Sequence, residues 1–373
     1  MSAHAFLAPS SAHRWVLCPA SPGMEAKYPE QGDKPSAVEG TAAHAVMEAM
    51  LANRAPPPDA TPEMIDGAML VVDVVRNILA HHPGAWIMVE KPVQIPRVHP
   101  QNWGTTDVRI WDEGSQNLWV IDYKFGHGVV EIFENWQLVD YVAGCLTEIN
   151  AMNSVAGMPA TSEVGVMVHM AVIQPRAYHP LGPVRWWEVG ATLLRDRIHH
   201  LSMAADEATS ATAQCKPHPV ACEHCSARHA CDALQRAAYR GMDIARAAIG
   251  VDLPPAALGL ELRMVDEALQ LLEARKSGLA QQVEMLMRAG KVVPHWTMVA
   301  GQTREKWVKP DAEVIALGAM MGVDLAKPPE AITPAQAKAK GVDATVVAAF
   351  SMRPPGAMKL AIDNGAQARR VFS

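Results

Sequence analysis

Apolar positions recur along the chain with two periods. A spacing of three or four residues predicts helices with one buried face over residues 36–53, 62–82, 135–151, 188–211 and 256–289. Short β-branched and aromatic runs, separated by brief turns, predict an antiparallel meander at 86–96, 105–111 and 118–124. A nearly continuous apolar run at 164–174 predicts a strand buried on both faces. These elements together indicate a mixed α/β chain.

The stretches between these elements are less regular. Residues 1–35 predict an irregular segment with one short helix that ends at Leu17. A further extended piece is expected at 129–132. The strand at 164–174 follows a helix, so we expect it to pair parallel with the meander and to make the sheet mixed.

Composition and charge fit a globular protein rather than a generally basic nucleic-acid binder. The 373 residues are 49% hydrophobic and 19% charged, with a net charge of −6. A nuclease is not excluded, because acids that hold metals make the charge more negative. No apolar run reaches about 18 residues, and no signal peptide is recognisable. We expect a cytoplasmic location without membrane contact, where cysteines act as metal ligands or free thiols rather than disulfides.

Two acids and a lysine fall on neighbouring strands of the meander. Asp107 lies on the second strand, and Asp122 and Lys124 are two residues apart on the third, so their side chains share a face. Asp122 ends an apolar run, where a charge is costly unless it is paired or bound to a metal. Mg²⁺ and Mn²⁺ prefer such oxygen ligands, and the carbonyl of Tyr123 can add another. Lys124 can hold or deprotonate an attacking water.

The ordered motifs Gly40-x-x-x-His44, Asp107, Asp122-x-Lys124 and Gln137-x-x-x-Tyr141 span about 100 residues. This arrangement resembles the RecB-like branch of the PD-(D/E)xK nuclease superfamily. The resemblance implies a restriction-endonuclease-like core with a mixed central sheet flanked by helices. It also implies that His44, Asp107 and Asp122 bind the metal and that Lys124 acts on the attacking water. Gln137 and Tyr141 would shape the site or contact DNA. Gly40 is expected to permit close approach of its helix to the sheet.

Three cysteines form the pattern Cys222-x2-Cys225-x5-Cys231, a strong signal for a metal or cluster. Two kinds of centre fit the residues. A local zinc site would take its fourth ligand from Cys215, His218, His224 or His229. A [4Fe-4S] cluster would take it from Cys18, far away in the sequence.

Resemblance to the AddAB helicase–nuclease and the CRISPR-adaptation exonucleases favours the iron–sulfur cluster. Those nucleases carry one cysteine before the nuclease motifs and a C-x2-C-x5-C after them. By this resemblance Cys18, Cys222, Cys225 and Cys231 hold the cluster, which joins the N-terminal segment to the end of the domain. Cys145 is expected to be a buried helix thiol, and Cys215 to be free.

The expected organisation is a nuclease domain at 1–235, a helical extension at 236–290 and a small region at 291–373. The last region is expected to contain a hairpin turning near Gly301 and a basic tail that ends in Arg369 and Arg370. Three basic residues and a tryptophan at 302–309 fit DNA contact. The apolar stripe of the long helix also fits a dimeric coiled coil.

The chain also looks like a phage- and prophage-encoded family of such proteins. The expected function is a Mg²⁺- or Mn²⁺-dependent deoxyribonuclease, most simply an exonuclease, in phage DNA replication or recombination. Its partners would be DNA and phage recombination or replication proteins, in the cytoplasm of the bacterial host. The alternative is a non-catalytic DNA-binding or assembly protein that keeps the fold, and a nuclease assay with a chelator control discriminates the two.

Overall fold

The structure is a computed structural model that describes residues 5–30, 35–245 and 253–298, with residues 313, 315–316, 320 and 344–350. The chain divides into two compact units, Met1–Gln282 with Asp363–Ser373, and Val283–Ile362. The elements described below belong to the first unit, except residues 283–298 and 344–350, which belong to the second. The predicted boundaries after residues 235 and 290 remain predictions.

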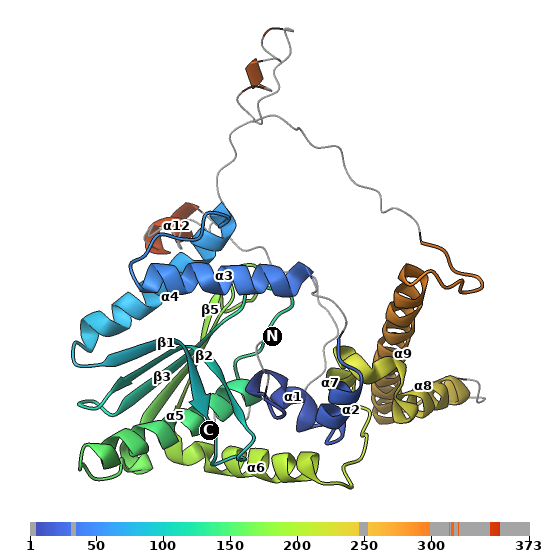
Figure 1. The fold of residues 1–373 in the computed structure, drawn as a ribbon, viewed down its shortest axis with the longest axis horizontal. Coiled ribbons are helices and arrows are strands. Elements are labelled where there is room, and N and C mark those ends of the chain that lie inside the picture. Colours follow the sequence, from blue (N-terminus) through green and yellow to red (C-terminus); the bar gives the residue numbers. More distant parts are fainter. Residues whose placement is uncertain are drawn as a thin grey trace. The chain divides into compact units, whose positions relative to one another are not determined.

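A five-stranded sheet forms the centre of the first unit (Figure 1). Its strands lie side by side in chain order: β1 Trp86–Gln94, β2 Trp103–Asp112, β3 Asn117–Tyr123, β4 Met167–Ile173 and β5 Val184–Gly190. All neighbours are antiparallel except β3 and β4, which are parallel because helix α5 (Trp136–Val155) connects them. The predicted meander and the predicted parallel pairing are therefore confirmed.

Helices cover both faces of the sheet. Helices α3 (Pro35–Leu51) and α4 (Pro62–His81) pack on one face, and α5 and α6 (Arg195–Thr209) pack on the other (Figure 1). Strand β4 shows the consequence directly, since Met170 joins the core beneath α5 and Ala171 joins the core beneath α3 and α4. This alternation confirms that the strand is buried on both faces, and the fold is a mixed α/β sheet flanked by helices.

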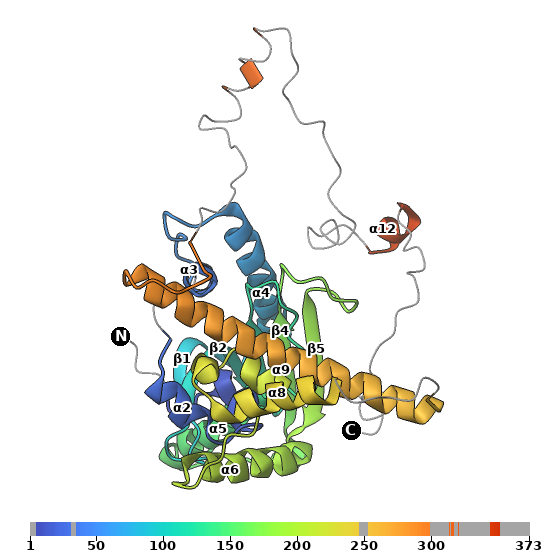
Figure 2. The same ribbon diagram turned by 90° about the vertical axis from the view of Figure 1, so that its right-hand side faces the viewer.

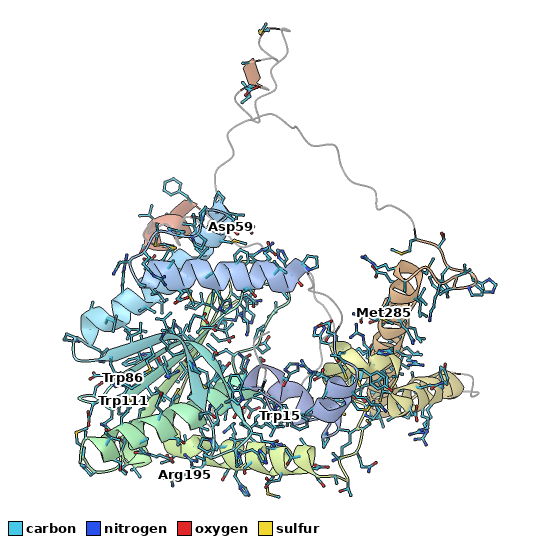
Figure 3. The ribbon with its side chains drawn as sticks, in the orientation of Figure 1. Trp15, Asp59, Trp86, Trp111, Arg195 and Met285 are labelled. Atoms are coloured by element: carbon cyan, nitrogen blue, oxygen red, sulfur yellow. The ribbon has the colours of Figure 1, made fainter. Side chains whose placement is uncertain are left out.

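The start of the chain packs beside a segment from beyond residue 210. Contacts join α1 (Ala12–Trp15) to α7 (Pro219–Glu223), and α2 (Ser21–Lys27) to the 3-10 turn η4 (Ser226–His229). Trp15 is fully buried and anchors α1 in the core beneath α5 (Figure 3). The remaining elements are the 3-10 turns η1 Pro9–Ser11, η2 Glu163–Gly165 and η3 Ala191–Leu194, and the helices α8 Asp232–Ala245, α9 Pro255–Arg288 and α12 Ala344–Phe350.

The long helix α9 confirms the helix predicted at 256–289. Gly290 ends it with a positive φ of 77°. Gly278 lies against η4, because an added Cβ there would come within 2.6 Å of the Arg228 side chain. Leu234 of α8 and Ala274 of α9 join one small buried cluster with Cys222, where the two helices cross (Figure 2). No helix among the described residues is both long enough and apolar enough to span a bilayer.

Some sequence predictions are wrong. The helix predicted to begin at residue 188 begins at Arg195, because the preceding Val184–Gly190 alternates buried and exposed positions and forms β5. Residues 129–132 form a loop rather than an extended element of the sheet, and the first 35 residues hold helices beyond the one that was predicted.

The described residues include only part of the predicted C-terminal region. Residues 291–298 of the predicted hairpin contain a turn but no strand. The rest of the hairpin, the basic stretch at 302–309 and the tail with Arg369 and Arg370 lie outside the described residues.

The two glycines Gly144 and Gly40 differ in their surroundings. Gly144 brings α5 against β1, since an added Cβ would lie 2.8 Å from Val93 and 2.9 Å from Ile95. Gly40 on α3 has nothing within 4 Å of an added Cβ, so the close approach to the sheet expected there is wrong.

We expect Gly144→Ala to destabilise the protein by about 1–3 kcal/mol through overpacking. Gly40→Ala should stabilise it by about 1 kcal/mol, because alanine favours the helix and meets no neighbour. Urea-induced unfolding of both variants measures the two effects. Equal midpoints for the two variants would contradict this packing.

Candidate functional site

Asp107 and Asp122 lie side by side on β2 and β3. The register pairs Val108 with Ile121, so the next step along both strands brings the two acids together on the face beneath α5. The Asp122 side chain is only 3% exposed. The amide of Tyr123 donates a hydrogen bond of 2.6 Å to Asp107 Oδ2, which joins the two strands at this end.

Lys124 and Gln137 close around Asp122. Lys124 Nζ lies 2.9 Å from Asp122 Oδ1, and Gln137 donates to the same oxygen over 2.9 Å while its own Oε1 lies 3.3 Å from Lys124 Nζ. Asn135 caps α5 through Leu138 N, which fixes the first turn and so places Gln137.

Tyr141 lies one turn further along α5. Its hydroxyl lies near Gln137. Its ring lies against Gly104 of β2, where an added Cβ would be 3.0 Å from Tyr141 Cε1 and 2.9 Å from Pro9 Cδ. The predicted pair Gln137 and Tyr141 is therefore brought to the acids, with η1 packed behind it.

His44 reaches the acids from α3, on the other face of the sheet. Its Nδ1 lies 2.9 Å from Glu90 Oε1 and 3.5 Å from Asp107 Oδ1. Among the described residues, one group brings three possible metal-ligand atoms (imidazole nitrogens, thiol sulfurs or carboxylate oxygens) within 4.8 Å of one another. This group is His44, Glu90 and Asp107. The structure thus brings His44 together with the acids, as the resemblance implied.

Glu90 is a site residue that the sequence reasoning missed. It lies on β1 between Val89 and Lys91, whose partners on β2 flank Asp107. Its φ of 48° is left-handed, which costs a non-glycine residue about 1–3 kcal/mol and signals a functional constraint. The available signal was a glutamate directly after the apolar run at residues 86–89.

Arg176 ties the loop after Lys124 to the helices above it. Its guanidinium bonds the Phe125 carbonyl at 3.4 Å and pairs with Glu39 at 2.9 Å and Glu63 at 3.3 Å. Because Glu39 belongs to α3, this ion pair helps to hold the helix that carries His44.

Burial makes the carboxylates costly to ionise. Burial, offset in part by Lys124, raises the pKa of Asp122 to about 6, and burial also raises the pKa of Asp107. Burial opposes the charged form of His44, but Asp107 and Glu90 outweigh it and raise its pKa to about 9. Asp122 and Asp107 likewise outweigh burial and raise the pKa of Lys124. The site therefore gathers negative charge that its own cations only partly compensate.

The donor set fits a divalent cation. Carboxylate oxygens with one imidazole suit Mg²⁺ or Mn²⁺, and such an ion would compensate the buried negative charge. His44, Glu90, Asp107 and Asp122 are the side chains that would hold it. The carbonyl of Tyr123, whose amide already bonds Asp107, remains a predicted ligand.

A second site is a small cavity lined by thiols. Cys18, Cys222, Cys225 and Cys231 all line it, so the structure brings the four predicted cluster ligands together from both ends of the first unit. Cys215, expected to be free, lines the same cavity. Cys145 is buried in α5, as expected.

Thiols are soft ligands that suit iron–sulfur clusters or zinc. Four thiolates around zinc, at about 2.3 Å each, would lie about 3.8 Å apart, whereas no three described thiols lie within 4.8 Å of one another. Burial raises the pKa of Cys222 to about 11 and of Cys225 to about 12, so the thiolates need a metal to form. His218, His224 and His229 are not among the residues that line the cavity. The thiols could hold an iron–sulfur cluster or, if they move closer together, a zinc ion.

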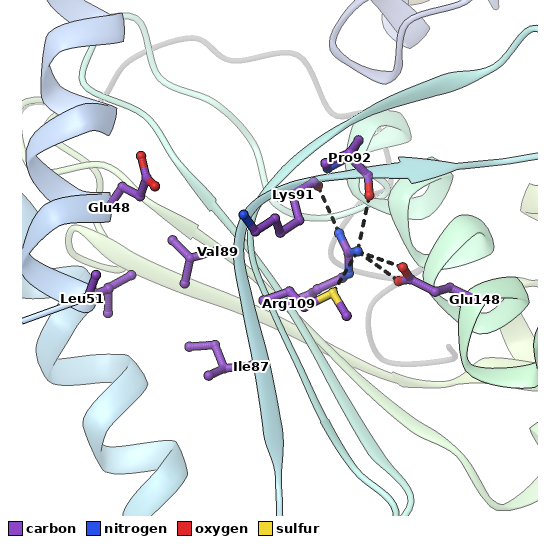
Figure 4. A pocket seen from close by; sticks show the side chains of 10 residues that line it. Glu48, Leu51, Ile87, Val89, Lys91, Pro92, Arg109 and Glu148 are labelled. Carbon is purple, nitrogen blue, oxygen red and sulfur yellow. Dashed lines mark hydrogen bonds and ion pairs between the residues drawn. The ribbon is translucent and has the colours of Figure 1, made fainter. Parts of the chain in front are cut away.

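A groove of about 540 Å³ lies at the free edge of β1 (Figure 4), where it is lined by Val89 and Lys91, the two sequence neighbours of Glu90. One wall is apolar, with Leu51, Ile87 and Val89. The buried Arg109 forms the floor and pairs with Glu148 at 2.9 Å. Lys91 stands at the groove and forms no ion pair with any acid that the structure describes.

The fold and the two sites define an α/β protein with an acid cluster suited to a divalent cation and a separate thiol cavity. The chain belongs to the family described as "Protein of unknown function (DUF2800)", which matches residues 4–365. Among solved structures, one described as "Crystal structure of SSO0001" is 12% identical, with 60% of this chain and 85% of that chain covered. Its TM-score of 0.26 is too low to carry an argument.

Mn²⁺ should raise the melting temperature, and more strongly at about pH 7 than at about pH 5. Below the raised pKa of Asp122, protons occupy the carboxylate and compete with the cation, so the stabilisation by metal grows as the pH rises through about 6. Thermal melts with and without Mn²⁺ measure the shift.

Glu90→Gln should lose most of that shift, while Glu113→Gln, an exposed control in the β2–β3 turn, should keep it. A full Mn²⁺ shift in the Glu90 variant would remove Glu90 from the site.

Proposed function

We propose that this protein is a Mg²⁺- or Mn²⁺-dependent nuclease that hydrolyses phosphodiester bonds in DNA. The observation that carries the proposal is the convergence of buried acids, a lysine and a histidine on one point. These residues come from α3, β1, β2, the end of β3 and α5. A purely structural ion-pair network has no need of three neighbouring carboxylates, two of which burial makes hard to ionise.

The residues have distinct roles in this proposal. A bound cation would polarise the scissile phosphate and lower the pKa of an attacking water. Lys124 is held by Asp122 and Gln137, and its raised pKa keeps it cationic. It is therefore suited to orient the water and to stabilise developing negative charge, rather than to accept a proton. Tyr141, which lies near Gln137, would shape the site around the DNA.

The residues that carry the resemblance to the RecB-like branch of the PD-(D/E)xK superfamily include His44, Asp107, Asp122, Lys124 and Gln137, and these lie together in the site. We propose on this basis a restriction-endonuclease-like core, exonuclease action on DNA, and a place in phage DNA replication or recombination with the corresponding phage proteins. Glu90 strengthens the proposal, because it adds to the site a third carboxylate that does not belong to the motifs that carry the resemblance.

The thiol cavity supports a [4Fe-4S] cluster, with zinc as the alternative. Cys18 follows α1 directly, and η1 just before α1 packs on Gly104 and Tyr141. A centre bound by Cys18 would therefore hold the N-terminal segment against the acid cluster. The proposed cluster is structural, and no step of the reaction passes through it.

Asp107→Ala, Asp122→Ala and Lys124→Ala should each reduce Mn²⁺-dependent DNA degradation by about 10²-fold or more, because each removes a group that acts on the reacting phosphate or water. End-labelled linear and circular DNA, with a chelator control, measures the activity and separates exonuclease from endonuclease action. Asp59→Ala, at an exposed position, should retain full activity. Unchanged activity in all three site variants would refute the assignment. A wild type without any nuclease activity would favour the non-catalytic DNA-binding alternative.

Lys91→Ala should raise the KM for single-stranded DNA several-fold with little change in kcat. The reason is that Lys91 offers a free cation beside an apolar wall, which suits a phosphate and a base next to the reacting centre. Steady-state kinetics measure both constants. Arg263→Ala, which removes a cation that does not line the groove, is the control. An effect on kcat alone would contradict binding of the DNA strand at Lys91.

A further inference from the structure

Five thiols line the cavity, although a four-iron cluster or a zinc ion takes four. The additional thiol belongs to Cys215, in a stretch without helix or strand that follows α6. The spacing of the cysteines in the sequence does not reveal this, because Cys215 stands seven residues before the pattern that begins at Cys222.

Backbone hydrogen bonds fix the position of Cys215. The amide of Ala20 donates to the Gln214 carbonyl over 3.2 Å, and the amide of Lys216 donates to Cys18 Sγ over 3.4 Å. Cys215 lies between these two bonds, so its thiol is held next to Cys18 by residues on both sides.

Cys215 and Cys231 line the same cavity, and after burial Cys231 is the group that most strongly raises the pKa of Cys215, so the two thiols are close neighbours. Both are partly exposed, whereas Cys18 and Cys222 are buried. Two neighbouring sulfurs that line one small cavity can exchange places at a metal with only a small movement, because the rest of the ligand set stays where it is.

We propose that Cys215 is an exchangeable ligand of the thiol site, which can take the place of Cys231. The site would then bind a thiophilic centre, an iron–sulfur cluster or zinc, through Cys18, Cys222, Cys225 and either of the two neighbours. The inference rests on the proposed metal–thiolate site but not on the proposed nuclease activity. The fifth thiol keeps the N-terminal segment attached when Cys231 is lost as a ligand.

The test compares Cys215→Ser, Cys231→Ser and the double variant in the full chain, purified without oxygen. Cys222→Ser has no neighbour that can replace it, and Cys145→Ser removes a buried thiol elsewhere. Iron, acid-labile sulfide and zinc per chain, with the visible spectrum, measure the loading. In a Co²⁺ titration of the metal-stripped protein, the charge-transfer absorption of Co²⁺–thiolate bonds measures coordination by the cysteines. We expect both single variants and Cys145→Ser to bind at the wild-type stoichiometry. The double variant should fall to the level of Cys222→Ser.

A second measurement needs only one variant. In metal-loaded Cys231→Ser, Cys215 should resist alkylation by iodoacetamide, and metal removal should restore its reaction, as read by mass spectrometry. Three results would overturn the proposal: Cys231→Ser as empty as Cys222→Ser, a double variant that binds as well as Cys231→Ser, or Cys215 equally alkylated with and without metal. A wild type that takes up no iron, zinc or cobalt overturns it as well, whatever its nuclease activity.

Discussion

The buried carboxylates of Asp107 and Asp122 are the constraint on which the site depends. Two acids on adjacent strands repel each other and lose hydration, so they persist only where cations and donors surround them. Lys124, Gln137 and the Tyr123 amide supply these contacts from the α5 face, and His44 supplies one from the opposite face. The site therefore holds together both helical layers at one end of the sheet.

The same constraint explains the strained backbone at Glu90. A left-handed residue inside an edge strand is tolerated only where the surroundings fix it, and here its side chain meets His44. Glu90 adds a third carboxylate to a place where, among the described residues, His44 and Lys124 are the two cationic side chains. A divalent cation would offset this excess of negative charge, so the local strain and the raised carboxyl pKa values are consistent with the same proposal.

The thiol cavity links the two ends of the first unit in a similar way. Cys18 is separated from Cys222 by the whole sheet domain, yet both line one cavity. Cys18 is connected to the site of Asp107 and Asp122 through α1 and η1, because these two elements pack on α5 and β2. A centre bound at the thiols thus supports the candidate site through packing rather than through any shared ligand.

Much of this arrangement follows from the sequence, because it depends on local periodicity and spacing. The alternation of apolar residues predicts the meander, and the two-residue spacing of Asp122 and Lys124 places both on one face. The helix at Gln137 and Tyr141 follows from its apolar stripe and its cap. Strand β5 was missed because the alternation is one of burial and not of residue type: Arg185 is buried and Trp186 is exposed.

Other features were decided only by the tertiary structure. Glu90 enters the site through a backbone conformation that its neighbours in sequence do not dictate, and the register of β1 on β2 brings it opposite Asp107. Cys215 joins the thiols because residues 214–216 bond to Cys18 and Ala20, a pairing between distant segments. Sequence alone determined which residue types could form each site. Long-range packing decided which of them meet, because spacing along the chain carries no information about contacts that the folded core brings together.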